Sequence, residues 1–197
     1  ALFMKRGIES VVIGFLFSFL NDTDDRRAKA IVEQEMPGAF ACTSSYVAHI
    51  LREYERFSTA AMNAYVGPST SYYLKNLQDK LIGQGYRANL RVIQSNGSIS
   101  TVEACSQRAV TMLMSGPAGG VSGAIHFCKK AGFNDILTFD MGGTSTDVAL
   151  IQNAKARIRR ETRVADVTVR APSVDVRTVG AGGGSIAFVP ELTKALR

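Results

Sequence analysis

The sequence predicts an α/β fold, in which strands alternate with helices along the chain. Short apolar runs typical of buried strands are interleaved with longer segments whose apolar residues recur every three or four positions, as on one face of a helix. The chain has 197 residues, of which 46% are hydrophobic and 20% are charged, and it shows no internal repeat. This composition is typical of a globular protein and excludes a disordered, collagen-like or coiled-coil chain.

The first predicted elements are a strand, a helix and a second strand. Residues 10–18 are dense in Val, Ile and Phe, which predicts a buried strand. The acidic turn that follows caps a helix over residues 24–35, and Pro37-Gly38 ends this helix. A short strand is expected at residues 40–43.

Composition also narrows the class of protein. The apolar run from Val11 to Leu20 would span only about 15 Å as a helix, against about 30 Å for a bilayer core, so no membrane segment is expected. His49 and His126 lack a metal-binding spacing and are expected to be structural. The net charge of +6 permits binding to anions without requiring it. The three cysteines, Cys42, Cys105 and Cys128, are odd in number, lie far apart and form no Cys-x-x-Cys pair. Reduced thiols and a cytoplasmic location are therefore expected.

Two amphipathic helices are predicted in the middle of the chain, over residues 47–65 and 71–82. Gly67-Pro68 separates them, because proline lacks the N–H that a helix interior requires. The two helices are expected to pack together. In the first helix, one broad face is formed by Ile50, Leu51, Tyr54, Phe57, Ala61 and Tyr65. In the second, the apolar residues at helical spacing are Tyr73, Leu77 and Leu81.

The next part of the chain contains short strands and one more helix. Strands are expected at residues 90–93 and 110–114, with a turn at residues 95–98 between them. A glycine-rich segment then opens a helix that runs to about Lys130, with Pro117 in the first turn, where a missing N–H costs nothing.

The last third of the chain is predicted to be mostly strand. Two apolar strands, residues 136–140 and 147–151, are separated by a glycine turn. Residues 157–177 alternate polar and apolar side chains, as strands do. A second glycine-rich loop follows at residues 180–184.

The turn between the two apolar strands has the residue types of a phosphate site. Residues 140–147 read Asp-Met-Gly-Gly-Thr-Ser-Thr-Asp. Glycines allow positive φ and a close approach of the backbone to a ligand, and the N–H and hydroxyl donors of residues 143–146 can surround an anion. Asp140 faces a phosphate favourably only when a cation lies between them, which indicates Mg²⁺. The predicted ligand is therefore a magnesium nucleotide, and a tight hairpin without a ligand is the alternative.

Two further glycine-rich segments have weaker signals. The loop at residues 180–184 indicates a close approach of the backbone, either to a nucleotide or to another strand. Residues 115–124 offer a helix N-terminus that can bind an anion, but their small side chains suit close packing on a sheet, and packing is the favoured interpretation. The turn at residues 140–147 differs from the Rossmann and P-loop phosphate sites, because it has neither fingerprint.

A basic stretch lies between residues 157 and 177 and raises the question of nucleic-acid binding. No aromatic residues are interleaved for base stacking, and acidic residues dilute the charge. A solvated strand face or a subunit contact is therefore expected rather than a nucleic-acid surface. The arginines concerned are Arg157, Arg159, Arg160, Arg163, Arg170 and Arg177.

Several motifs resemble the hydantoinase A / 5-oxoprolinase / acetone carboxylase family. In chain order they lie at residues 53–59, 63–66, 94–97, 115–120, 140–147 and 180–187. The resemblance covers nearly the whole chain in the right succession. It implies a ribonuclease-H-like lobe of the actin, Hsp70 and sugar-kinase type, with a mixed sheet, flanking helices and bound Mg-ATP.

The resemblance also implies roles for particular residues. Asp140 would be the catalytic and metal-binding residue, which positions Mg²⁺ or a water. The β- and γ-phosphates would lie on the turn, and the adenosine near the second glycine loop. The cofactor-binding residues implied in this way are Gly142, Gly143, Thr144, Ser145, Thr146, Asp147, Gly182, Gly183 and Gly184.

The function that the resemblance implies is ATP-dependent hydrolysis of a cyclic amide, such as a hydantoin or 5-oxoproline, by phosphorylation of a carbonyl oxygen. An ATP-dependent carboxylase of a ketone and a non-catalytic nucleotide-binding scaffold are the alternatives. Members of the family carry a first phosphate hairpin that nothing in these residues matches. Residues 1–45 are therefore expected to end one lobe and residues 46–197 to form most of a second, which needs a partner subunit or a further lobe for activity.

Overall fold

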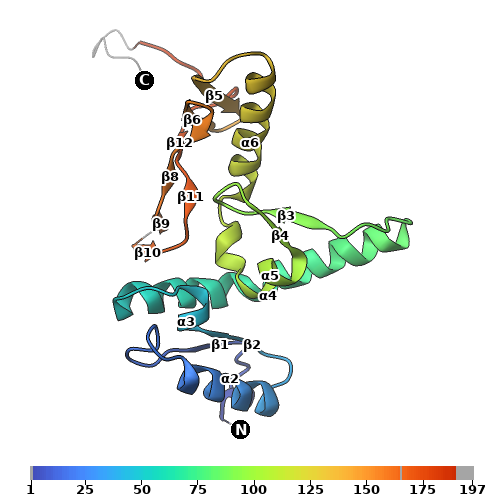
Figure 1. Cartoon of the computed structure of the whole chain (residues 1–197), viewed down its shortest axis with the longest axis vertical. Coiled ribbons are helices and arrows are strands. Elements are labelled where there is room, and N and C mark those ends of the chain that lie inside the picture. Colours follow the sequence, from blue (N-terminus) through green and yellow to red (C-terminus); the bar gives the residue numbers. More distant parts are fainter. Residues whose placement is uncertain (1, 165, 190–197) are drawn as a thin grey trace.

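A computed structural model describes residues 2–164 and 166–189 and shows an elongated molecule in which one long helix crosses the middle (Figure 1). Below this helix lies an N-terminal unit of two parallel strands and two helices. The elements of this unit are α1 (Leu2–Lys5), β1 (Ser10–Ile13), α2 (Thr23–Glu35) and β2 (Phe40–Thr43). The predicted helix at residues 24–35 and the strand at residues 40–43 are confirmed.

The first strand is shorter than predicted. It ends at Ile13, and residues 14–20 form a loop that polar groups hold in place. The backbone N–H of Phe15 donates to Asp25 at 3.0 Å, and that of Phe17 donates to Glu53 at 3.2 Å, which lowers the pKa of the Glu53 carboxyl. Phe17 has a φ of 58°, which no strand residue adopts. The apolar side chains of the loop therefore lie largely in solvent instead of in a core.

The loop rests on a buried arginine. Arg56 is 0% exposed, and its guanidinium donates to the carbonyl oxygen of Phe15 at 2.8 Å and to the hydroxyl of Ser44 at 3.2 Å. The same group lies 5.1 Å from the centroid of the Phe57 ring, within the range of a cation–π contact. Arg56 thus joins the loop to the beginning of the long helix.

Replacing Arg56 with leucine is expected to lower the free energy of unfolding by about 2–4 kcal/mol, because buried acceptors lose their donor. Urea unfolding followed by circular dichroism measures the loss. Arg26→Leu is the matched control, since the side chain of Arg26 is 69% exposed and forms only a surface ion pair. Equal stabilities for the two variants would contradict the structural role of Arg56.

The long helix, α4 (Glu53–Gly83), corrects the prediction of two helices. A short helix, α3 (Ser44–Val47), precedes it, and α4 then continues through Gly67 and Pro68 without interruption. A Cβ at residue 67 would lie 2.4 Å from the ring of Phe40, so glycine lets the helix cross β2 closely at this point. Packing on both sides of Pro68 keeps the helix intact despite the missing N–H.

The buried face of α4 also differs from the predicted one. Tyr54 and Tyr65 are 69% and 82% exposed, whereas polar residues of the helix are buried. The side chain of Asn63 donates to the carbonyl oxygen of Gln107 at 3.0 Å and accepts from the N–H of Val110 at 3.0 Å. The apolar periodicity missed this face because its polar members bind backbone groups of neighbouring segments. The buried residues of α4 are Arg56, Thr59, Ala60, Asn63, Ala64, Gly67 and Leu74.

A small unit connects α4 to the last part of the chain. The predicted strand at residues 110–114 is wrong: a 3₁₀ helix lies there, because the N–H of Val110 bonds to a side chain of α4 instead of a neighbouring strand. Val110 packs in a core with Ala60, Ala64 and Val169. The elements of this unit are β3 (Arg91–Ile93), β4 (Ile99–Thr101), α5 (Val102–Gln107) and η1 (Ala109–Met112).

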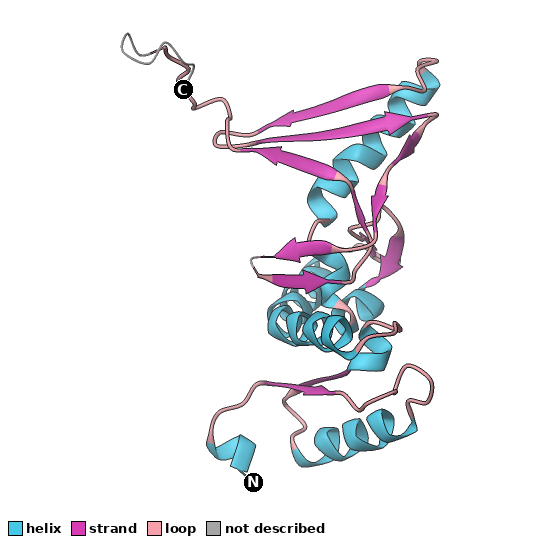
Figure 2. Cartoon of the chain, turned by 90° about the vertical axis from the view of Figure 1, so that its left-hand side faces the viewer, coloured by secondary structure: helices cyan, strands magenta, loops and turns pink. Residues whose placement is uncertain are grey.

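The far end of the molecule is a sheet with one helix on it. Strands follow the order β12-β6-β5, and β7 pairs with the C-terminal end of β6. Helix α6 (Ser115–Lys130) lies along one face of this sheet (Figure 2). Ala118 and Val121 of α6 pack on Ala149, Ile151 and Val176 of the sheet. The sheet strands are β5 (Ile136–Met141), β6 (Thr146–Gln152), β7 (Lys155–Ala156) and β12 (Val176–Val179).

Short strand pairs connect this sheet to the middle of the molecule. They confirm that residues 157–177 are largely extended. The antiparallel pair β9–β10 packs on α4, where the hydroxyl of Thr59 accepts from the N–H of Arg170 at 2.8 Å. These strands are β8 (Ile158–Arg159), β9 (Thr162–Val164), β10 (Val167–Val169) and β11 (Ser173–Val174).

Two of the three cysteines are core residues. Cys42 and Cys105 are 3% and 0% exposed, and burial raises the pKa of both thiols.

Because thiolate is the reactive form, we expect a maleimide near pH 7 to label half-buried Cys128 more than about tenfold faster than Cys42 and Cys105. The raised pKa keeps labelling of Cys42 and Cys105 slow as the pH rises toward 8. Mass spectrometry of labelled peptides measures the rates, urea-unfolded protein is the control, and equal native rates would contradict the prediction.

Candidate functional site

The bend between β5 and β6 is the best candidate site, and it lies at an exposed end of the sheet. The two strands are antiparallel, with Asp140 opposite Asp147 and Met141 opposite Thr146. The N–H of Gly142 donates to the carbonyl oxygen of Ser145 at 2.9 Å and closes the bend. Residues 142–144 are exposed, so a ligand can reach the bend from solvent.

The second glycine loop packs directly against this bend. The N–H groups of Gly183 and Gly184 each donate at 2.9 Å, to the carbonyl oxygens of Gly142 and Gly143 respectively. On the other side, the hydroxyl of Thr146 donates to the carbonyl oxygen of Ala181 at 2.6 Å. The structure therefore brings together two segments that the sequence analysis assigned to one ligand.

Gly182 is the residue that makes this contact sterically feasible. A Cβ at this position would lie 2.6 Å from the carbonyl oxygen of Gly142 and 2.7 Å from the backbone nitrogen of Ser145. Only glycine fits at that distance from backbone atoms. Gly142 and Gly143 do not adopt the positive φ that glycine allows, since the described glycines with positive φ are Gly7, Gly85, Gly97 and Gly132. Residue 182 must be glycine because backbone atoms of the bend lie too close for a Cβ, and not because its φ is positive.

Three backbone donors of the bend remain without a partner. Within the part of the chain that the structure describes, the N–H groups of Gly143, Thr144 and Ser145 make no hydrogen bond. The carbonyl oxygens of Gly142 and Gly143 are turned toward the second glycine loop and are already bonded there. The bend therefore has three N–H groups without a partner, while the carbonyl oxygens of Gly142, Gly143 and Ser145 are bonded, and this surplus of donors favours an anion.

Two carboxylates lie at the base of the bend. Asp140 and Asp147 are direct cross-strand partners on the face that α6 covers, and like charges in this arrangement repel each other. The hydroxyl of Thr178 donates to Asp147 Oδ1 at 2.6 Å and stabilises one of the two charges. Sequence reasoning missed Thr178, which the pairing of β12 with β6 places opposite Asp147.

A hollow of about 460 Å³ adjoins the carboxylates between α6 and the sheet. Pro117, Gly120 and Ala124 of α6 form one wall, and Asp140 lies at the wall formed by the sheet. The helix packs on the sheet through Ala118 and Val121, but the small residues expected to allow this packing do not make it, because a Cβ at Gly116, Gly120 or Gly123 would meet open space. The hollow is large enough for a small ligand group.

Few side chains among the described residues are placed to bind a metal ion. Among residues 2–164 and 166–189, no three His, Cys, Asp or Glu side chains lie close enough together to hold an ion. Asp140 and Asp147 supply two carboxylates, so a cation here would need further oxygen ligands from water or phosphate.

Four of the six arginines of the basic stretch form ion pairs within the chain, namely Arg157, Arg159, Arg163 and Arg170. Arg159 pairs with Asp175, and Arg170 pairs with Glu161 at 2.8 Å and with Glu55 at 3.7 Å. This pattern agrees with the expected strand face. No helix within the described residues is long and apolar enough to cross a membrane.

Comparison with known proteins identifies relatives of the chain. A sequence profile described as hydantoinase/oxoprolinase matches residues 56–197. The α subunit of caprolactamase from Pseudomonas jessenii is 31% identical over 189 residues, which are 96% of this chain and 27% of that protein. The 5-oxoprolinase of Saccharomyces cerevisiae is 31% identical over 181 residues, or 91% of this chain and 14% of that enzyme.

Solved structures agree with the sequence comparison. The ATP-dependent caprolactamase of Pseudomonas jessenii superimposes with a TM-score of 0.82 at 31% identity, over 96% of this chain and 27% of that one. A nucleotide-free acetone carboxylase superimposes with a TM-score of 0.79 at 27% identity, over 98% of this chain and 28% of that one. The α/β fold class is confirmed, and the chain spans less than a third of the length of these relatives.

Proposed function

This chain belongs to the hydantoinase/oxoprolinase family, and we propose that it forms part of the ATP-binding lobe of a hydrolase that opens cyclic amides. Caprolactam and 5-oxoproline, after which two of its relatives are named, are both cyclic amides. The caprolactamase is described as ATP-dependent, which supports the use of ATP here. An ATP-dependent ketone carboxylase is the second candidate, because acetone carboxylase superimposes on nearly the whole chain.

The single observation that carries this proposal is the polarity of the bend. Three N–H groups without a partner, at Gly143, Thr144 and Ser145, adjoin the hydroxyls of Thr144 and Ser145 at an exposed sheet end, whereas the buried hydroxyl of Thr146 is bonded to Ala181. Neighbouring N–H and hydroxyl donors without a partner can stabilise phosphate oxygens. The bend is therefore assigned to the β- and γ-phosphates of ATP.

The residues present fit Mg²⁺ only as part of a shared ligand set. The paired carboxylates of Asp140 and Asp147 repel each other, and a divalent cation beside them would remove this repulsion. Asp140 is assigned as the residue that holds Mg²⁺, directly or through water, while Thr178 holds the Asp147 carboxylate in place. When bound, Mg-ATP would supply the phosphoryl group that activates the amide carbonyl oxygen.

In this proposal, residues of the chain orient the phosphates of ATP and stabilise the negative charge on them. The N–H groups of residues 143–145 orient the phosphates and stabilise the charge that develops during transfer. Gly183 and Gly184 hold the two carbonyl oxygens of the bend away from the phosphates by bonding to them. Gly182, Gly183 and Gly184 are also assigned to the adenosine side of the nucleotide.

Residues 46–197 are assigned to most of one lobe and residues 1–45 to the end of another. The parallel pair β1–β2 and α2 precede the proposed boundary, and the family profile begins shortly after it, at residue 56. A second lobe, or a partner subunit, is assigned the other side of the nucleotide. Relatives such as the caprolactamase α subunit are components of larger enzymes by name. Residues 1–197 alone are not expected to turn over substrate.

The test is ADP release by the complete protein with Mg-ATP and each candidate substrate. Release that depends on 5-oxoproline, a hydantoin or caprolactam supports the hydrolase, and stoichiometric ring opening measured by mass spectrometry confirms the product. Release only with a ketone and bicarbonate supports the carboxylase instead. ATP binding without turnover of any of these compounds would support a non-catalytic scaffold and reject both activities.

A further inference from the structure

The hollow of about 460 Å³ between α6 and the sheet lies next to the bend that is assigned to the phosphates of ATP. One side of α6 lines it at helical spacing, through Pro117, Gly120, Ala124 and Cys128. Asp140, the last residue but one of β5, lines it at the end toward the bend. Its volume is in the range of small-molecule sites, so a ligand held here would lie beside the proposed nucleotide.

The walls of this hollow are mostly apolar, and its charge is negative. Val121 of α6, Ile136 of β5 and Val176 of β12 contribute hydrocarbon. Among the described residues that line the hollow, Asp140 and Asp147 are the only charged ones. Walls of this kind favour a ligand that has an apolar body, a hydrogen-bond donor at one end and no negative charge.

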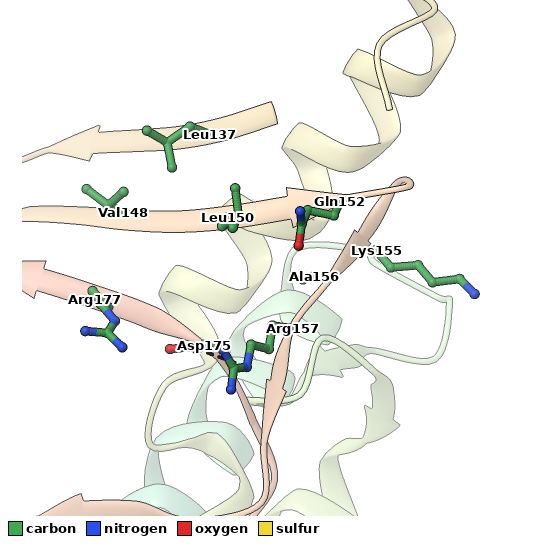
Figure 3. A pocket seen from close by; sticks show the side chains of 9 residues that line it. All are labelled: Leu137, Val148, Leu150, Gln152, Lys155, Ala156, Arg157, Asp175 and Arg177. Carbon is green, nitrogen blue, oxygen red and sulfur yellow. Dashed lines mark ion pairs between the residues drawn. The ribbon is translucent and has the colours of Figure 1, made fainter. Parts of the chain in front are cut away.

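The positive charge near the sheet lies on its other face. Figure 3 shows Lys155, Arg157 and Arg177 there, around a separate hollow. The sheet itself lies between these cations and the hollow beside α6. A substrate with a carboxylate, such as 5-oxoproline, would therefore meet two aspartates and no cation among the described residues that line the hollow beside α6. A lactam such as caprolactam carries no charge and avoids this repulsion.

We propose that the hollow beside α6 binds the ring of an uncharged lactam, which rests on the hydrolase proposed above and names its substrate class. The methylene groups of the ring would lie against the apolar walls, and the amide would lie at the end formed by the aspartates. The N–H of the amide would donate to Asp147. Thr178 donates to Oδ1 of this carboxylate, and Oδ2 has no hydrogen-bond partner in the part of the chain that the structure describes.

The cyclic form of the amide suits this arrangement. A small ring holds its amide cis, so that the N–H and the carbonyl oxygen point to the same side. When the N–H faces Asp147, the carbonyl oxygen also faces the end of the hollow next to the bend, where the phosphates are assigned. A linear secondary amide is trans and would turn its carbonyl oxygen away from the bend.

The natural thiol of Cys128 reports whether the hollow is occupied. In the complete protein with Mg²⁺ and a non-hydrolysable ATP analogue, saturating caprolactam is expected to slow maleimide labelling of Cys128 about tenfold, because the ring covers part of this lining. Labelling of Cys42 and Cys105, which do not line the hollow, should stay unchanged. The analogue without caprolactam gives the reference rate. No protection by caprolactam would overturn the proposal.

Two related compounds test the charge and the N–H. 5-Oxoproline carries a carboxylate and N-methylcaprolactam lacks the N–H, so each should need at least about a tenfold higher concentration than caprolactam to protect Cys128. Equal protection by the three compounds would overturn the proposal. ADP release that requires caprolactam, with Cys128 unprotected, would reject the hollow as the ring site and leave the hydrolase standing. Protection without amide-dependent ADP release would support lactam binding and reject the hydrolase.

Gly120→Leu tests the position of the ring. A Cβ at residue 120 would meet no atom within 4 Å, so a longer side chain can extend into the hollow, and leucine favours a helix more than glycine does. The caprolactam concentration that halves Cys128 labelling should rise at least about tenfold, and less for the smaller ring of 2-pyrrolidinone.

Gly123→Leu is the matched control for this variant. Residue 123 lies on the same helix and also meets open space, but it does not line the hollow. The protecting concentration of caprolactam should therefore match that of the wild type. Equal concentrations for Gly120→Leu and Gly123→Leu, or an equal rise for both lactams in Gly120→Leu, would overturn the assignment of the ring to this hollow.

Discussion

Replacing Asp140 with alanine in the complete protein is expected to reduce Mg-dependent ATP turnover by about 10²–10³-fold, the scale seen when one preorganised electrostatic group is removed from a site. The reason is that Asp140 is the carboxylate assigned to the cation, and it lies between the bend and the hollow beside α6. ADP release at saturating Mg-ATP measures the effect.

The same substitution should leave the fold intact. Asp140 faces Asp147 across the strands, so its removal relieves a like-charge repulsion of about 0.2–1 kcal/mol, and the melting temperature should stay equal or rise slightly. Asp140→Asn tests whether the charge itself is needed. Asp79→Ala, on the exposed side of α4, is the control for a lost carboxylate. Turnover by Asp140→Ala equal to that of the wild type would contradict the role of Asp140 in holding Mg²⁺.

Gly182→Ala is expected to separate the second glycine loop from the bend. The new Cβ would lie 2.6–2.8 Å from backbone atoms of residues 142, 143 and 145, which cannot move aside as a flexible side chain can. Overpacking of this kind costs about 1–3 kcal/mol and would break the bonds from Gly183 and Gly184. ATP affinity, measured by calorimetry, should fall about tenfold, because 1.4 kcal/mol corresponds to one decade.

Gly180→Ala is the matched control in the same loop. A Cβ at residue 180 would meet no atom within 4 Å, and its φ does not require glycine, so affinity and melting temperature should match the wild type. A comparable loss in both variants would show that general loop flexibility matters instead of the contact at residue 182. Unchanged ATP affinity in Gly182→Ala would separate this loop from the nucleotide site.

Local sequence signals predicted the elements that depend on local physics. The helix that ends at Lys130, the strand at residues 40–43 and the two strands around the bend follow from apolar runs, turn residues and first-turn proline, and all are present. The same signals failed at Gly67-Pro68, where a proline interrupts an isolated helix but not one whose neighbouring turns are buried, as at Ala64, Gly67 and Leu74.

Other errors arose where side chains of distant segments compete for backbone groups. Asn63 takes the N–H of Val110, and the predicted strand there becomes a 3₁₀ helix. Asp25 and Arg56 bind the backbone of Phe15, and the predicted first strand ends early. Neither contact leaves a periodic signal, because each joins residues at least ten positions apart.

By itself the sequence determined the α/β class, the family and the residue types of the phosphate bend, because these depend on composition, local periodicity and motif order. Only the tertiary structure decided how the bend is presented. Strand pairing sets Asp140 opposite Asp147 and Thr178 beside it, and the glycine loop occupies the carbonyl oxygens of the bend while its N–H groups stay free. Hydrogen bonds between segments set this polarity, and their partners are fixed only once the chain has folded.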